Sequence, residues 1–116
     1  MVHMATYTCA TYSLVINRIQ KPFNPMLGET YELITDKFRL YSELVSHHPP
    51  VIAFNCQGNR WEMDKNVETI IKFNGKHVTV EDFNLTHIKL HPKCLKVPEH
   101  YVMSLPKMTV GNLMFG

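Results

Sequence analysis

The sequence has no long apolar run, no long run of one charge and no paired-cysteine motif in its 116 residues. No stretch approaches the roughly 18 apolar residues of a membrane-spanning helix. Its 12 basic and 10 acidic residues give a net charge of +2, which disfavours binding to a nucleic-acid backbone. Three cysteines without C-x-x-C spacing, Cys9, Cys56 and Cys94, exclude a disulfide framework and fit a reducing compartment. We therefore expect residues 1–116 to form a single domain, or a fragment of one, that works in water.

Segments with β-strand character are what the sequence does contain. They recur at roughly 8–12-residue spacing without a convincing amphipathic helix between them, which predicts an antiparallel meander that curls into a barrel or part of one. Asn74-Gly75 is the strongest hairpin signal, because both residues accept the positive φ of a type I′ turn. Residues 4–15 are rich in Thr, Tyr and Val, and we expect a strand there as well. The other expected strands are 30–34, 38–45, 51–56, 61–63, 67–73, 77–83, 85–90, 101–105 and 108–115.

The first of two loops with notable chemistry spans residues 21–30 and reads KPFNPMLGET. Its two prolines fix φ and limit the conformational entropy lost on binding. Lys21 is a flexible point charge suited to a phosphate, and Asn24 carries both donors and an acceptor. The alternative is an ordinary turn with a solvated lysine.

The second loop spans residues 46–50 and reads SHHPP. Its prolines hold the backbone away from helical geometry, so that His47 and His48 can both present an imidazole edge to one anion. Two protonatable donors beside Lys21 form a plausible phosphate site.

Metal and enzyme hypotheses find less support. A metal site at His47 and His48 would need further ligands, for which His87, His91 and Cys94 are the candidates, but no H-E-x-x-H or paired-cysteine spacing supports it. A phosphoesterase that uses the histidine pair is an alternative, yet no catalytic set is assembled around it. We therefore expect no enzyme activity, no metal and no cofactor. The seven methionines and six phenylalanines fit either a core or the lining of a pocket for hydrophobic ligands.

Taken together, the two loops resemble the signature of the oxysterol-binding-protein-related family of lipid-transfer proteins. That signature is E-Q-V-S-H-H-P-P preceded by K-P-x-N-P-x-L-G-E, and the matching residues here are 43–50, ELVSHHPP, and 21–29, KPFNPMLGE. One departure is Leu44, which stands where the family usually has Gln, and which alters the hydrogen bonding expected beside the histidines.

The resemblance implies a fold and a set of ligand-binding residues. It implies an all-β, mainly antiparallel meander that forms part of a large lipid-binding β-barrel with a hydrophobic tunnel, incomplete within these residues because the family domain is considerably longer. The residues implied to bind the lipid head group are Lys21, Asn24, His47 and His48. Those implied to lie near the tunnel entrance are Leu27, Gly28 and Glu29.

The resemblance also implies the function. We expect a protein that binds and transfers lipids between membranes, taking phosphatidylinositol 4-phosphate and either sterol or phosphatidylserine. It would be cytoplasmic and would associate peripherally with membranes or membrane contact sites. Its partners would include a transient membrane surface but no nucleic acid. If phosphate binding favours protonated histidines, head-group affinity should weaken as the pH rises above neutrality. The alternative is a truncated fragment without transfer activity that forms homo-oligomers or other contacts through open strand edges.

Overall fold

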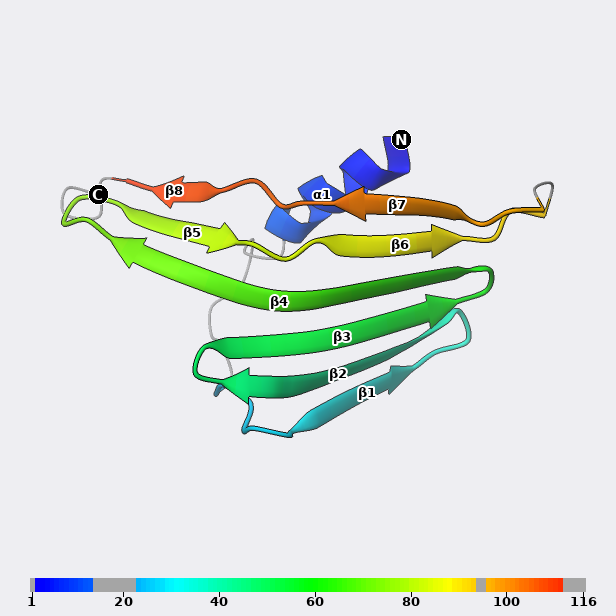
Figure 1. Cartoon of the computed structure of the whole chain (residues 1–116), viewed down its shortest axis with the longest axis horizontal. Coiled ribbons are helices and arrows are strands. Elements are labelled where there is room, and N and C mark those ends of the chain that lie inside the picture. The colour runs from blue at the N-terminus through cyan, green and yellow to red at the C-terminus, as the bar shows by residue number, and fades with distance from the viewer. Residues whose placement is uncertain (1, 14–22, 94–95, 112–116) are drawn as a thin grey trace.

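The computed structural model describes residues 2–13, 23–93 and 96–111, which form one helix and one antiparallel sheet (Figure 1). The prediction of a mainly antiparallel β-fold is confirmed, and the sheet is open. Its elements are α1 (Val2–Ser13), β1 (Thr30–Ile34), β2 (Phe38–His47), β3 (Pro50–Gly58), β4 (Trp61–Phe73), β5 (Val78–Asp82), β6 (Thr86–Leu90), β7 (Glu99–Met103) and β8 (Met108–Val110).

The sheet is a meander in which the later strands are interrupted. Strands β1 to β4 follow one another as antiparallel neighbours. The second edge of β4 pairs with β6 along its first half and with β5 along its second half. β5 and β6 therefore act together as one long strand with a break in it. β7 pairs with β6 and β8 pairs with β5, so β7 and β8 form a second interrupted strand beside the first. The strands expected at 61–63 and 67–73 are both parts of the long β4.

The hairpin predicted at Asn74-Gly75 is present, but the turn type predicted for it is wrong. Phe73 pairs with Val78, so the connection has four residues instead of two, and Gly75, with φ 87°, is the residue in it that has a positive φ. The Asn74 side chain explains the difference, since its Oδ1 accepts the backbone N–H of His77 at 2.9 Å. This side-chain bond replaces a two-residue turn with a wider Asx-type loop.

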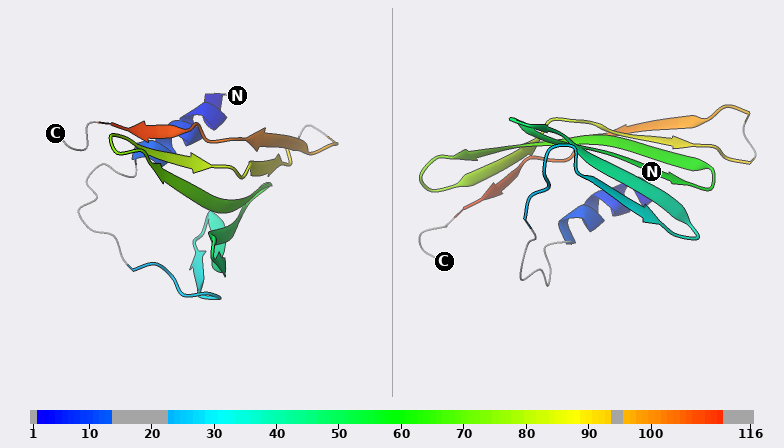
Figure 2. Two further views of the ribbon diagram at one scale, coloured as in Figure 1. Left: turned by 60° about the vertical axis from the view of Figure 1, so that its left-hand side comes forward. Right: turned by 90° about the horizontal axis from the view of Figure 1, so that it is seen from below.

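The strand expected over 4–15 is wrong for residues 4–13, because Val2–Ser13 forms helix α1, and residues 14 and 15 lie outside the described residues. Figure 2 shows that the sheet is strongly bent and that α1 lies on one side of it. Thr8 Oγ1 lies 2.8 Å from Met103 Sδ on β7. Burial, and then the nearby Cys56 on β3, raise the pKa of Tyr7. Packing against the sheet therefore overrides the local β propensity of Thr and Tyr.

The two faces of the sheet differ sharply in polarity. Residues directly opposite each other on neighbouring strands share a face. One row across β2, β3, β4, β6 and β7 is apolar and consists of Leu40, Cys56, Met63, Ile88 and Tyr101. The next row, on the opposite face, is polar and consists of Arg39, Gln57, Glu62, Lys89 and His100. We call these the inner and outer faces.

The inner face is the one that α1 covers, since Cys56 and Met103 both belong to it. The buried apolar residues Leu44, Cys56 and Ile88 also lie on it. The buried apolar side chains are therefore concentrated on one side of a bent sheet.

Among the described residues there is no helix whose length and hydropathy would let it cross a membrane.

Candidate functional site

A β-bulge in β2 determines which face His47 occupies. The register between β2 and β3 shifts after Leu44, so that Leu44 lies opposite Ile52 and His47 lies opposite Pro50. In a regular strand His47, three residues after Leu44, would point to the opposite face. The extra residue reverses this and returns His47 to the side of Leu44, a common use of bulges near functional sites. His47 thus stands at the end of the inner face.

The two histidines lie side by side at the β2–β3 turn. The turn is shorter than the five-residue loop expected from the sequence, because His47 and Pro50 are already paired strand residues and only His48 and Pro49 connect them. The His48–Pro49 peptide is cis, and Ser46 Oγ donates to the Pro49 carbonyl at 2.7 Å. The ring centroids of His47 and His48 lie 4.4 Å apart. Both imidazoles are exposed and can reach the same ligand.

The segment before β1 is a tight turn fastened to β2. The Glu29 N–H donates to the Met26 carbonyl at 2.9 Å, and Gly28 has φ 78°, the geometry of a type II turn that needs glycine at its third position. The Glu29 carboxylate accepts the Met26 N–H at 2.7 Å. Backbone bonds from Gly28 N–H to Leu44 O at 2.9 Å and from Leu44 N–H to Glu29 O at 3.2 Å attach this turn to β2. They bring the preceding residues, Asn24 and Pro25, beside the histidines.

These two segments enclose a pocket of about 370 Å³. Three of its residues, Asn24, His47 and His48, carry polar side chains, while Leu44 and Ile52 contribute apolar surface from the inner face. The remaining lining residues are Pro25 and Pro50. The arrangement offers hydrogen-bond donors for an anion at one end of a surface suited to hydrocarbon.

The residues expected at the site from the sequence fall into three groups. Asn24, His47 and His48 line the same pocket, whereas Lys21 lies outside the described residues. Leu27 and Gly28 form the turn and do not line the pocket. Glu29 lines a neighbouring cavity of about 120 Å³ that shares Pro25, Leu44 and Ile52 with the pocket.

Leu44, the departure from the family signature, is 4% exposed and forms part of the pocket wall. Its backbone N–H and carbonyl both bond to the turn before β1. The side chain therefore adds apolar surface where the signature has an amide, while its backbone keeps the two segments together.

The sequence reasoning missed an ion pair on the inner face. Lys65 Nζ lies 2.5 Å from Asp82 Oδ2, and the two side chains are only 5% and 11% exposed. Lys65 lies opposite Phe54 and Thr86, which places it on the inner face. The alternation of Met63, Lys65 and Val67 along one strand could have revealed it, since the two apolar neighbours mark Lys65 as inward-pointing.

The histidines that were candidates for a metal site lie elsewhere. His87 is on the outer face, where its Nδ1 is 3.1 Å from Nε2 of His100 and the rings stack with centroids 5.3 Å apart. His91 lies beyond β6 and bonds to Arg60 through its backbone. In the described parts of the chain no group of three or more His, Cys, Asp and Glu residues could hold a metal ion.

Comparison with known proteins gives consistent results along the whole chain. The family model described as oxysterol-binding protein matches residues 1–116. Oxysterol-binding protein homolog 2 of Saccharomyces cerevisiae is 38% identical over 117 residues, covering 99% of this chain and 9% of that protein.

Two solved structures share the fold. The Osh1 ORD domain in complex with ergosterol superposes with a TM-score of 0.84 at 30% identity, covering 95% of this chain and 27% of that one. The Osh3 ORD from Saccharomyces cerevisiae in complex with PI(4)P gives 0.83 at 32% identity, covering 97% of this chain and 31% of that one. The chain therefore spans less than a third of these domains and about a tenth of the curated relative.

Proposed function

The chain belongs to the oxysterol-binding protein family, and from that premise we propose that it binds lipid along its inner face and takes part in lipid transfer between membranes, without catalysing a reaction. The observation that carries the proposal is the pocket in which Asn24, His47 and His48 meet the apolar side chains of Leu44 and Ile52. A phospholipid needs both of these surfaces, one for the head group and one for the acyl chains.

The chemistry of the pocket favours a phosphate monoester such as that of phosphatidylinositol 4-phosphate. Such a group carries a charge of about −1.5 to −2 at neutral pH and has three strong acceptor oxygens. His47 and His48 can donate to it when protonated, Asn24 can donate through its amide, and Lys21 would add a positive charge. Charge-assisted hydrogen bonds of this kind are about twice as strong as neutral ones.

The inner face would hold the hydrocarbon part of the ligand. Two of its rows are apolar, Leu40 with Cys56 and Met63, and Leu44 with Ile52 and Val67, and the row between them contains Lys65; the pocket lies beside the second apolar row. The solved relatives were crystallised with ergosterol and with PI(4)P, which supports a sterol as a second ligand; phosphatidylserine is the alternative. A carrier of this kind would act in the cytoplasm, peripherally at membranes.

The proposal is tested by extraction of labelled phosphatidylinositol 4-phosphate from liposomes at fixed salt. The His47→Ala/His48→Ala variant removes two charge-assisted donors, each worth about 1.5–3 kcal/mol, and extraction should fall at least tenfold. His87→Ala/His100→Ala is the matched control, because it removes a stacked histidine pair from the outer face, and it should extract like the wild type.

The pH dependence is a second readout of the same assay. A phosphate favours the protonated imidazoles, so affinity should decrease as the pH rises above neutrality. Equal extraction by the wild type and the His47→Ala/His48→Ala variant, or a flat pH profile, would contradict the assignment of the histidines.

A second candidate function is association through a strand edge. Among the described residues β1 pairs only with β2, and its Tyr31 and Ile34 side chains are 58% and 61% exposed. An unpaired edge of this kind can add a strand from another chain. A stable dimer in light scattering, together with no lipid extraction by the wild type, would favour this function over lipid transfer.

A further inference from the structure

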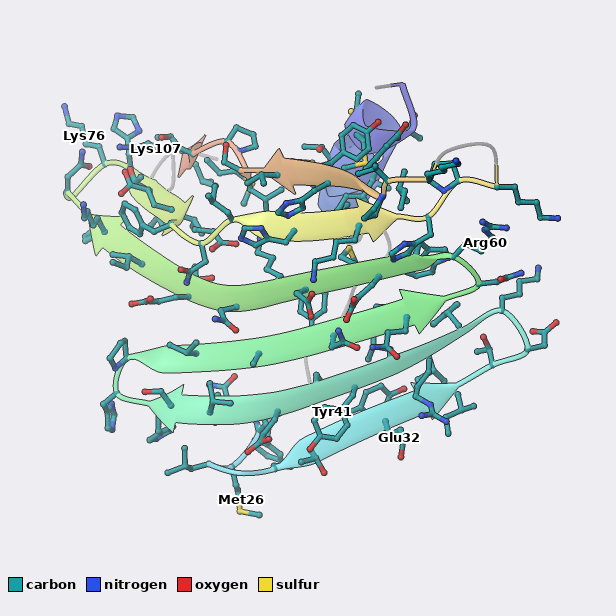
Figure 3. All side chains as sticks on the ribbon, turned by 45° about the vertical axis from the view of Figure 1, so that its right-hand side comes forward. Met26, Glu32, Tyr41, Arg60, Lys76 and Lys107 are labelled. Carbon is teal, nitrogen blue, oxygen red and sulfur yellow. The ribbon has the colours of Figure 1, made fainter. Side chains whose placement is uncertain are left out.

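Three large apolar side chains project into solvent beside the pocket. Phe23 is 101% exposed, Met26 is 74% exposed and Leu27 is 65% exposed. They flank two pocket residues, since Asn24 and Pro25 lie between Phe23 and Met26 in the sequence and line the pocket. Figure 3 shows the Met26 side chain pointing away from the sheet. We call Phe23, Met26 and Leu27 the apolar tip.

Both backbone polar groups of Met26, in the apolar tip, and the N–H of the neighbouring Gly28 have hydrogen-bond partners. The Met26 N–H bonds to the Glu29 carboxylate, the Met26 carbonyl accepts the Glu29 N–H, and the Gly28 N–H bonds to Leu44 O. An apolar medium penalises unpaired backbone groups. The hydrogen bonds of Met26 and Gly28 therefore lower the cost of moving this turn into such a medium, while its side chains gain from leaving water.

We propose that the apolar tip inserts into the boundary between head groups and acyl chains of a lipid bilayer and so holds the pocket at the level of the head groups. This inference rests on the proposed function, because a phosphate that enters the pocket would belong to a membrane lipid. A bilayer is the partner that fits, because the exposed tip residues lie next to the pocket in which we propose that a membrane lipid is bound.

The charge at this end of the molecule agrees with a bilayer as the partner. The β4–β5 turn lies at the same end of the sheet as the β2–β3 turn, and it carries the exposed Lys76 (Figures 1 and 3). Basic side chains near a membrane surface are attracted by anionic lipids. Figure 3 shows Lys76 at the other corner of this end from Met26, so this cation would attract anionic lipids without being part of the apolar tip.

The first experiment measures partitioning of the full chain onto vesicles of phosphatidylcholine and phosphatidylserine that contain no phosphoinositide. The Phe23→Ser/Met26→Ser variant should bind at least tenfold more weakly, because two large side chains no longer enter the bilayer. Val97→Ser is the control: its side chain is 72% exposed and it precedes β7, which begins at the opposite end of the sheet (Figure 1). Partitioning of the tip variant equal to that of the wild type would overturn the inference.

A second arm separates this inference from the proposed function. Binding of soluble inositol 1,4-bisphosphate, measured by calorimetry, should be unchanged in Phe23→Ser/Met26→Ser and lost in His47→Ala/His48→Ala. The histidine variant should still partition onto the phosphoinositide-free vesicles. If the wild type fails to bind the soluble head group while the tip variant still loses membrane binding, the head-group assignment fails and the tip inference stands.

A depth measurement tests insertion directly. The chain has a single tryptophan, Trp61, at the start of β4 and at the opposite end of the sheet from the pocket (Figure 1). Vesicles with brominated acyl chains should quench the added emission of a Phe23→Trp variant and leave the emission of Trp61 in the wild type unchanged. Absence of quenching in the variant, or equal quenching of Trp61, would overturn insertion by the apolar tip.

Discussion

Lys65 and Asp82 place opposite charges on the face of the sheet that carries most of its buried apolar side chains. Each charge alone would be costly to bury, and the short contact between Lys65 Nζ and Asp82 Oδ2 offsets part of that cost. The Asp82 side chain also accepts a hydrogen bond from the backbone N–H of Asn84 at 3.2 Å. At the residue scale, the Lys65–Asp82 ion pair is thus a polar contact on the inner face, which we propose holds the hydrocarbon part of the ligand.

Removing one partner of this ion pair should destabilise the fold more than removing both. Lys65→Met leaves the Asp82 carboxylate largely buried and without its cation, which should lower the free energy of unfolding by about 3 kcal/mol. The Lys65→Met/Asp82→Leu double variant should recover most of this loss. Urea denaturation of the two variants and the wild type measures both values. Equal losses in the single and double variants would show that the ion pair contributes little.

At the scale of elements, the site depends on the contact between the turn before β1 and the bulged end of β2. Gly28 and Glu29 bond to Leu44, and the bulge that follows Leu44 turns His47 to the inner face. Two segments that are separated in sequence thus become the two walls of one pocket. A distortion of either segment should change ligand binding as well as stability.

A pair of glycine substitutions separates these two effects. Gly28 and Gly75 have φ values of 78° and 87°, and a Cβ at either position would meet no atom within 4 Å. Gly28→Ala and Gly75→Ala should therefore each cost about 1–2 kcal/mol through backbone strain alone. Only Gly28→Ala should also weaken binding of the soluble head group, because Gly75 lies in the β4–β5 turn. Equal affinities in the two variants would contradict a role for the Gly28 turn in forming the pocket.

The sequence predicted some of these elements well and others poorly, for physical reasons. Turn chemistry at Thr35 and Asn74 is local, so both hairpins could be predicted, and Thr35 Oγ1 does accept the Phe38 N–H at 3.0 Å. Helix α1 could not be predicted, because Tyr7 and Thr8 favour strands locally and form a helix only where it packs on β3 and β7. The bulge after Leu44 also has no local sequence signal.

At the scale of the whole molecule, the division between the two faces follows from strand register. Alternation along one strand predicts that two faces exist, but only the pairing of β2, β3, β4 and β6 shows that Leu40, Cys56, Met63 and Ile88 form one continuous apolar row. Burial on this face raises the pKa of the Cys56 thiol. Asn24 and His47 were linked through the family resemblance, and their shared pocket depends on long-range pairing that composition and spacing do not specify.

Apart from Lys65 and Asp82, the same register directs many of the charged strand residues outward. Asn55 bonds to both Glu62 and Asp64 on the outer face, and Lys72 and Lys107 both contact Glu81. The exposed apolar side chains of this face, such as Ile34 and Val102, lie opposite Arg39 and His87. Because apolar and polar side chains are interspersed there, a lipid ligand should contact mainly the inner face.

Photocrosslinking with phosphatidylinositol 4-phosphate that carries a photoreactive group on an acyl chain tests this account most directly. After irradiation and peptide mapping, we expect adducts on inner-face residues near the pocket, such as Leu44, Ile52 and Val67, and a large reduction of these adducts in His47→Ala/His48→Ala. Adducts mainly on outer-face residues such as Asn55 and His87, or adduct yields that do not depend on the two histidines, would contradict the proposal that this pocket and the inner face form one lipid site.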